Sequence, residues 1–101
     1  MGLDVLVYDN DKRLVSELEI KEALHKEIFA VHKRWESYLY LRKLYDYYRT
    51  NEVFSGKELN GLVTDLTNYK PHLVGEYQKM IQSMLEVITD KKVHKIRING
   101  D

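Results

Sequence analysis

The sequence lacks cysteine, which excludes a disulfide, a thiolate metal ligand and a cysteine nucleophile. It also lacks a long hydrophobic run, because no apolar stretch approaches the ~18 residues that a transmembrane helix needs. The opening residues contain no basic segment followed by an apolar core, so they do not have the pattern of a signal peptide. Together, these absences predict a cytoplasmic protein in a reducing compartment.

A net charge of one sign is absent as well, since 16 basic residues balance 16 acidic ones. A chain without net charge has no overall field that attracts nucleic acid or an anionic membrane. The charges are nevertheless distributed in blocks. Residues 31–51 carry five bases and two acids, whereas residues 1–30 carry seven acids and four bases. Such blocks are equally suited to pair within the chain and to face a partner.

Recognisable catalytic patterns are also missing. The five glycines form no phosphate-binding loop, and no serine lies in a Gly-x-Ser-x-Gly nucleophile elbow. His25 and His32 lie on one predicted helix but ~10 Å apart along its axis, which is too far for both to bind one metal ion. Glu22 and Glu36 are spaced to approach these histidines, yet the sequence places no third and fourth ligand. The sequence therefore predicts no cofactor, no metal site and no enzyme activity.

The 101 residues suit a single domain, residues 1–101, with one apolar core. Apolar runs and alternation predict strands at residues 3–8, 14–20 and 93–99. Apolar spacings of three and four predict helices at residues 20–33 and 39–49, from residue 55 to a break before Pro71, and at residues 71–89. The spacing of Ser16 and Glu19 also fits a capping box, so an earlier start of the first helix stays open. We predict an α+β fold in the order β-β-α-α-α-α-β, with one small antiparallel or mixed sheet.

Local signals mark three of the predicted boundaries. Asp9 and Asp11 favour a turn after the first strand, which makes the first two strands a plausible hairpin. Ser55 and Glu58 have the spacing of a capping box at the start of the third helix. Pro71 suits the first turn of the last helix, because its missing amide proton is not needed there.

The most informative segment is residues 38–54, which contains five tyrosines. The helix predicted at residues 39–49 has an apolar stripe formed by Leu41, Leu44, Tyr45 and Tyr48. Tyr40 and Tyr47 fall outside this stripe. Tyrosine buries a large area at low entropic cost and keeps a polar tip, which makes it common in protein interfaces. The alternative is that the extra tyrosines pack under the loop or against the sheet.

Several motifs resemble those of a group of small bacterial proteins related to polymorphic-toxin immunity proteins of the contact-dependent inhibition type. The motifs are Tyr-Leu-Arg-Lys-Leu-Tyr-Asp-Tyr-Tyr at residues 40–48, Glu-Val-Phe-Ser-Gly-Lys-Glu-Leu at residues 52–59, and the pair Asp65-Leu66. The opening Met1-Gly2-Leu3-Asp4 and the closing strand into Gly100-Asp101 are similar too. The group often has a proline where this chain has Leu39. The resemblance implies a cytoplasmic immunity protein that binds a toxin domain, often a nuclease, and it supplies no catalytic residues.

The leading hypothesis is therefore stoichiometric inhibition of a cognate toxin domain through a preformed surface. The predicted contact residues are Asp46, Tyr47 and Glu52, followed by Tyr40, Asp9 and Asp11. Acidic contacts would complement the phosphate-binding cleft of a nuclease, although the zero net charge weakens that version.

Two rival hypotheses remain open. The first is a small metal-dependent nuclease or hydrolase whose carboxylates, such as Asp9 and Asp46, converge only in the fold. The second is a nucleic-acid adaptor that uses Trp35, Arg42 and Lys43, because basic and aromatic residues alternate there.

Overall fold

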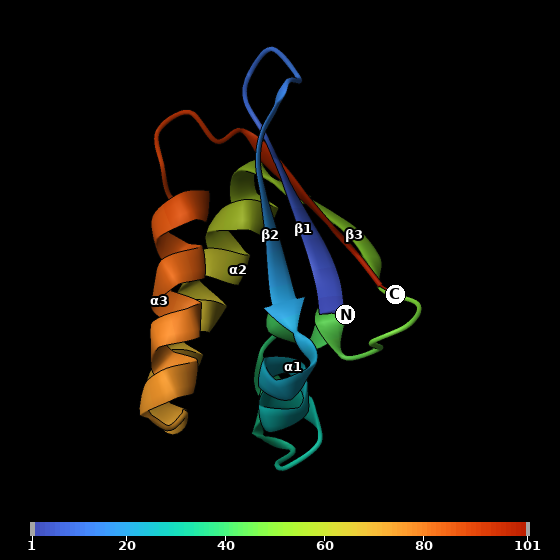
Figure 1. Ribbon diagram of the computed structural model, residues 1–101, viewed down its shortest axis with the longest axis vertical. Helices are drawn as coiled ribbons and strands as arrows, with labels where there is room; N and C mark the ends of the chain where they lie inside the picture. Colours follow the sequence, from blue (N-terminus) through green and yellow to red (C-terminus); the bar gives the residue numbers. More distant parts are fainter. Residues whose placement is uncertain (1, 101) are drawn as a thin grey trace.

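The computed structural model describes residues 2–100; Met1 and Asp101, which belong to the opening and closing motifs of the resemblance, lie outside the described residues. Within these residues the fold is α+β, with a four-stranded antiparallel sheet and three α-helices (Figure 1). The elements in chain order are β1 (Gly2–Tyr8), β2 (Leu14–Lys21), α1 (Glu22–Phe29), η1 (Arg34–Ser37), η2 (Leu41–Leu44), β3 (Asn51–Ser55), α2 (Gly56–Tyr69), η3 (Lys70–His72), α3 (Gly75–Ile88) and β4 (Lys95–Asn99). The three η elements are 3₁₀ helices of three or four residues.

The sheet brings the two ends of the chain together at its centre. Its strand order is β2-β1-β4-β3, and all three neighbouring pairs are antiparallel. Val5 of β1 lies opposite Leu18 of β2 on one side and Ile98 of β4 on the other. Because side chains alternate along a strand, one face of the sheet collects the buried residues Leu3, Val5, Val7, Phe54, Ile96 and Ile98.

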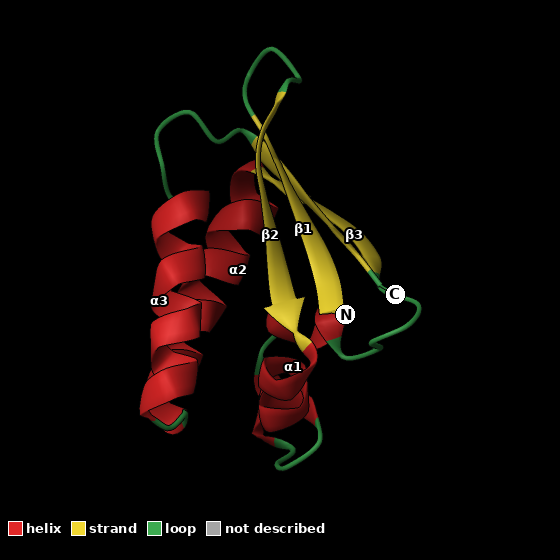
Figure 2. Ribbon diagram, in the orientation of Figure 1, coloured by secondary structure: helices red, strands yellow, loops and turns green. Residues whose placement is uncertain are grey.

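Figure 2 shows α2 and α3 side by side on one side of the sheet, with α1 below the sheet at the end where β2 finishes. Apolar side chains of every strand and every α-helix meet in one buried cluster. Tyr69, at the end of α2, is among the largest of these side chains, and its hydroxyl donates to the backbone oxygen of Ile28 in α1 over 3.2 Å. The opposite face of the sheet carries the exposed residues Glu17, Glu19 and Arg97.

The strands predicted at residues 3–8, 14–20 and 93–99 form as β1, β2 and β4, although β4 begins two residues later than predicted, and the sheet contains a fourth strand that was not predicted. This strand, β3, lies within the tyrosine-rich segment, where a helix was predicted at residues 39–49. That helix prediction is wrong. Only η2 forms there, because the carboxylate of Asp46 accepts the amide protons of Tyr48 and Arg49 and so turns the chain toward β3.

The helix boundaries also differ from the prediction. β2 continues to Lys21, so α1 is shorter than the predicted helix at residues 20–33. The capping box does not form at the start of α2: Ser55 ends β3 and makes no side-chain cap hydrogen bond. Pro71 lies in η3, and α3 begins only at Gly75. A separate turn therefore replaces the first turn of the predicted last helix.

Candidate functional site

Residues 30–50 form an irregular segment whose regular structure is limited to η1 and η2. Helix α2 holds the entry of η2 at two points. The carboxylate of Asp65 accepts the amide protons of Tyr40 and Leu41, with Oδ2 to nitrogen distances of 2.8 and 3.0 Å. One helical turn earlier, the ring of Tyr40 lies over Gly61, where a Cβ atom would come far inside van der Waals contact. Gly61 and Asp65 therefore fix the entry of η2 on the surface of α2.

The exit of η2 is held by a buried histidine in α1. His25 is 6% exposed, and its Nε2 lies 2.8 Å from the backbone oxygen of Leu44. Because a carbonyl oxygen only accepts, Nε2 carries the proton and donates it. Burial is the largest influence on His25 and lowers its pKa from the ordinary value of 6.5; the bond to Leu44 and the negative charge of Asp46 act in the opposite direction.

His25 is also the centre of an aromatic chain, which we define as Tyr48, Tyr47, His25, Phe29, Trp35 and Tyr45. Neighbouring rings in this chain have centroids 4.5 to 5.6 Å apart. Most pairs meet at an angle, whereas Trp35 and Tyr45 are stacked with an angle of 7° between their planes. The indole nitrogen of Trp35 donates to the backbone oxygen of Phe29 over 3.1 Å. The chain links α1 to both sides of η2.

Both ends of the aromatic chain reach solvent. Tyr45 is 57% exposed and Tyr48 is 70% exposed, while Trp35 between Phe29 and Tyr45 is half-buried. We name Trp35, Tyr45 and Tyr48 the aromatic surface. Exposed aromatic side chains held by packing against other rings are typical of binding anchors, since little side-chain entropy remains to be lost.

The burial of the tyrosines is the reverse of the sequence-based prediction. Tyr45 and Tyr48 were predicted to face the core and are exposed. Tyr40 and Tyr47 were predicted to lie outside the core stripe, and both are half-buried and packed against the core. The prediction depended on helical spacing, and the turn at Asp46 changes which side chains point inward.

The charges of the segment that contains the aromatic surface are mostly basic. The exposed basic residues of the segment are Lys33, Arg34, Arg42, Lys43 and Arg49. The acids of residues 31–51 are Glu36 and Asp46, so the block carries a net charge of +3, from five bases and two acids. A partner that covers this region must present acidic groups.

The six predicted contact residues do not gather at one place. Asp9 and Asp11 lie in the β1–β2 hairpin at the top of Figure 1, whereas Asp46 and Tyr47 lead into β3 at the opposite end of the sheet. The carboxylate of Asp9 accepts the amide protons of Asp11 and Arg13, each over 2.9 Å, so it stabilises the hairpin turn.

The other predicted contact residues are partly committed to the fold. Glu52 is half-buried on β3 opposite Ile98. Tyr40 is half-buried over Gly61, and Asp46 is half-buried in its turn. Reasoning from the sequence missed Gly61 altogether and gave Asp65 only as part of the Asp65-Leu66 motif, without its role in binding backbone amides. Their signal was a glycine in the middle of an amphipathic helix, four residues before an acid, a pattern that indicates close approach by another part of the chain.

Among residues 2–100, no cluster of three or more histidine, aspartate or glutamate side chains is arranged to hold a metal ion. In the same part of the chain, no helix combines the length and apolar character needed to cross a membrane. Comparison of the chain with models of protein families, with curated protein sequences and with solved structures found no significant match.

The Tyr40–Gly61 contact predicts an unusual effect of a glycine substitution. Gly61→Ala should lower the free energy of unfolding by about 1–2 kcal/mol, because the new methyl group displaces the ring of Tyr40. At a helix position with open space around it, replacing glycine by alanine would instead raise the free energy of unfolding by about 1 kcal/mol. Gly75→Ala is the matched control, since a Cβ there meets nothing within 4 Å. Urea denaturation measures both.

In a Tyr40→Ala background, Gly61→Ala should become stabilising, because the clash is gone. If Gly61→Ala stabilises the chain that retains Tyr40, the contact does not fix the segment.

The lowered pKa of His25 predicts a loss of stability in acid. The unfolded chain takes up a proton near pH 6.5 while the folded chain resists it, so stability is complete above about pH 7.5 and falls as the pH drops below about 6.5. His25→Gln should reduce the difference in unfolding free energy between pH 7.5 and pH 5. His32→Gln, at an exposed histidine, is the control and should retain that difference. An unchanged pH dependence in His25→Gln would contradict this assignment.

Proposed function

We propose that this protein is a non-catalytic immunity protein that binds and neutralises a cognate toxin domain in the cytoplasm. The observation that carries the proposal is the exposure of Tyr45 and Tyr48, two large aromatic side chains at the ends of a packed chain of rings. Single exposed apolar residues are ordinary on protein surfaces, but rigidly supported aromatic residues are the commonest energetic anchors of protein interfaces.

The support beneath the aromatic surface favours tight binding. Asp65 and His25 fix the two ends of η2, and Trp35 is held by its bond to Phe29 and by stacking on Tyr45. A surface that is ordered before binding loses less conformational entropy in the complex. Stoichiometric inhibition requires such high affinity, because the inhibitor has to outlast the enzyme that it blocks.

The charge around the aromatic surface suggests the character of the partner. Its basic side chains, such as Arg42 and Lys43, favour an acidic face of the toxin domain over a phosphate-binding cleft. If the toxin acts on nucleic acid, we therefore propose that this surface binds beside its active site. If the toxin has another target, the surface binds an acidic face on any part of the toxin. If acidic groups of this protein enter a nuclease cleft directly, they would have to be those of Asp46 and Glu52. The role of these two residues as contacts remains a prediction.

A coexpression experiment tests the proposal. The C-terminal domain encoded by the neighbouring open reading frame should be toxic alone and harmless when this protein is present. Tyr45→Ala and Tyr48→Ala should each weaken binding of the purified domain by about 2 kcal/mol, roughly 30-fold, as measured by calorimetry. Val74→Ala is the control, because Val74 is also a large exposed apolar residue (61% exposed) but immediately precedes α3 and is not part of residues 30–50.

A neighbouring domain that is harmless alone, or toxicity that persists on coexpression, would remove the basis for the immunity function. Full protection by the Tyr45→Ala/Tyr48→Ala double variant would instead reject the aromatic surface and leave the function standing.

Asp46 requires a pair of variants, because its carboxylate is half-buried and accepts two amide protons. Asp46→Asn keeps an acceptor for the turn and removes the charge, whereas Asp46→Ala removes both. If Asp46 contacts the toxin through its charge, both variants should weaken binding. If it acts only through the turn, Asp46→Asn should bind normally and Asp46→Ala should lose about 1 kcal/mol of stability or more in urea denaturation.

One observation favours a second candidate, a nucleic-acid adaptor. The stacked pair of Trp35 and Tyr45 lies in the same segment as exposed Arg42 and Lys43, and bases stack on such aromatic side chains. Binding of single-stranded oligonucleotides that weakens steeply with salt, and that is lost in Arg42→Ala/Lys43→Ala, would favour this reading over the immunity function.

A further inference from the structure

Strand β2 is an exposed edge of the sheet. It is eight residues long, and within residues 2–100 its one neighbouring strand is β1, so its other side presents backbone amide and carbonyl groups without a strand beside them. Proteins usually shield such edges from pairing with copies of themselves by proline, bulges or charged side chains. Here an irregularity opposite Val7 and Tyr8 interrupts the start of the strand, and the regular part from Ser16 to Lys21 carries the exposed charges of Glu17, Glu19 and Lys21.

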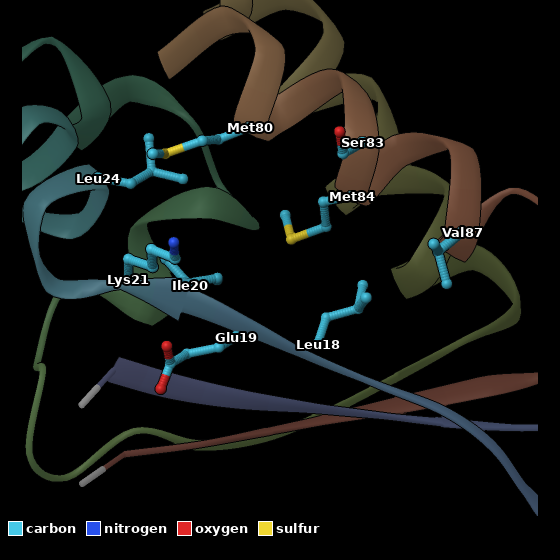
Figure 3. Close-up of a pocket in the computed structure, with 9 residues that line it drawn as sticks. All are labelled: Leu18, Glu19, Ile20, Lys21, Leu24, Met80, Ser83, Met84 and Val87. Atoms are coloured by element: carbon cyan, nitrogen blue, oxygen red, sulfur yellow. The ribbon is translucent and has the colours of Figure 1, made fainter. Parts of the chain in front are cut away.

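A groove runs along this edge between β2 and α3. Two adjoining hollows, each of about 280 Å³, share Val87 and together extend past most of β2. In Figure 3, Leu18 points toward Met84 and Val87, while the carboxylate of Glu19 points to the other side of the strand. The remaining apolar lining comes from Ile20, Leu24 and Met80. Methionine side chains adapt to the shape of what they contact, which suits a groove that accepts side chains from another molecule.

The charges along the groove are acidic in the middle. Glu17 and Glu19 occupy the outer face of β2 and are exposed, and Glu86 of α3 lines the second hollow. Lys21 lies toward one end of the groove, and Lys92 lies toward the other end together with Asp90. A strand added beside β2 would place alternate side chains over Glu17 and Glu19 and the others in the apolar groove.

These charges disfavour a second copy of the chain as the occupant. Antiparallel pairing of two β2 strands about their middle would place Glu17 or Glu19 of one copy directly opposite the same residues of the other. Like charges directly opposite one another destabilise a strand pair. A strand that alternates basic and apolar residues removes this repulsion. The sheet already contains one, since β4 reads Lys-Ile-Arg-Ile from residue 95 to residue 98 and pairs with β1.

We infer that the groove between β2 and α3 binds an extended segment of a partner protein, in which basic and apolar residues alternate, as a fifth strand beside β2. Backbone hydrogen bonds along the edge supply affinity, and the two faces of the segment supply specificity. The aromatic surface lies in a different part of the chain, so this site does not depend on the immunity function.

The test uses the full chain and a fluorescent eight-residue peptide that alternates isoleucine with lysine or arginine. Anisotropy should show saturable binding, and hydrogen exchange should slow at amides of β2. Glu17→Lys/Glu19→Lys should weaken binding by about tenfold or more, because two attractive cross-strand pairs become repulsive. The same variant should gain affinity for a peptide in which glutamate replaces the basic residues.

Glu36→Lys/Glu58→Lys makes the same change of net charge at exposed positions outside the groove and is the control, so it should bind normally. Tyr45→Ala/Tyr48→Ala should also bind the peptide normally, even if it fails to bind a toxin domain. The inference is overturned if the peptide does not bind, if the charge reversal has no effect, or if exchange slows at β3 instead. A chain that sediments as a dimer, with the amides of β2 protected from hydrogen exchange in that dimer, would also overturn it, because a second copy would then occupy the edge.

Discussion

The entry of η2 is fixed by Asp65 and Gly61 of helix α2, and the shape of the irregular segment depends on this contact. Residues 30–50 contain no strand and no α-helix, so their local turns are supported by side chains from other parts of the chain. Asp65 binds the two amides at the entry of η2, and Gly61 leaves room for the ring of Tyr40. Because α2 is itself packed on the sheet through Leu62 and Leu66, the rigidity of the core extends to the surface. The position of Leu44 then determines the hydrogen bond of His25, and through His25 the course of the aromatic chain.

This dependence explains how much of the fold could be predicted. The strands at both ends of the chain follow from local alternation, and the stripes of α2 and α3 follow from helical spacing, so all of these were found. The prediction of a helix at residues 39–49 was wrong, although the apolar residues there do have helical spacing. Spacing does not reveal that Asp65, about 25 residues away, binds the first amides, or that the carboxylate of Asp46 competes for later ones. Strand β3 was missed for a related reason: it is short, at the edge of the sheet, and pairs with residues 40 to 48 positions later.

The candidate site was predictable as a region but not residue by residue. Tyrosine content identified residues 38–54, which contain Tyr45 and Tyr48 of the aromatic surface but not Trp35. The prediction of which tyrosines face outward was reversed, because one turn at Asp46 rotates Tyr45 and Tyr48 away from the core. The acids chosen as contact residues illustrate a second limit. Asp9 and Asp46 accept backbone amide protons, as turn acids commonly do, and sequence alone does not separate this role from recognition. The basic character of the surface follows directly from the charge blocks of the sequence.

The stacking of Trp35 on Tyr45 has a practical consequence. Trp35 is the single tryptophan of the chain, and it is half-buried within the surface that we propose as the contact region. Its indole emission therefore arises from one place, and the half-buried ring is in partial contact with water. A molecule that covers Tyr45 would exclude this water and change the wavelength and intensity of the tryptophan fluorescence. The protein thus carries its own optical reporter at the position where a partner would arrive, with no need for a chemical label.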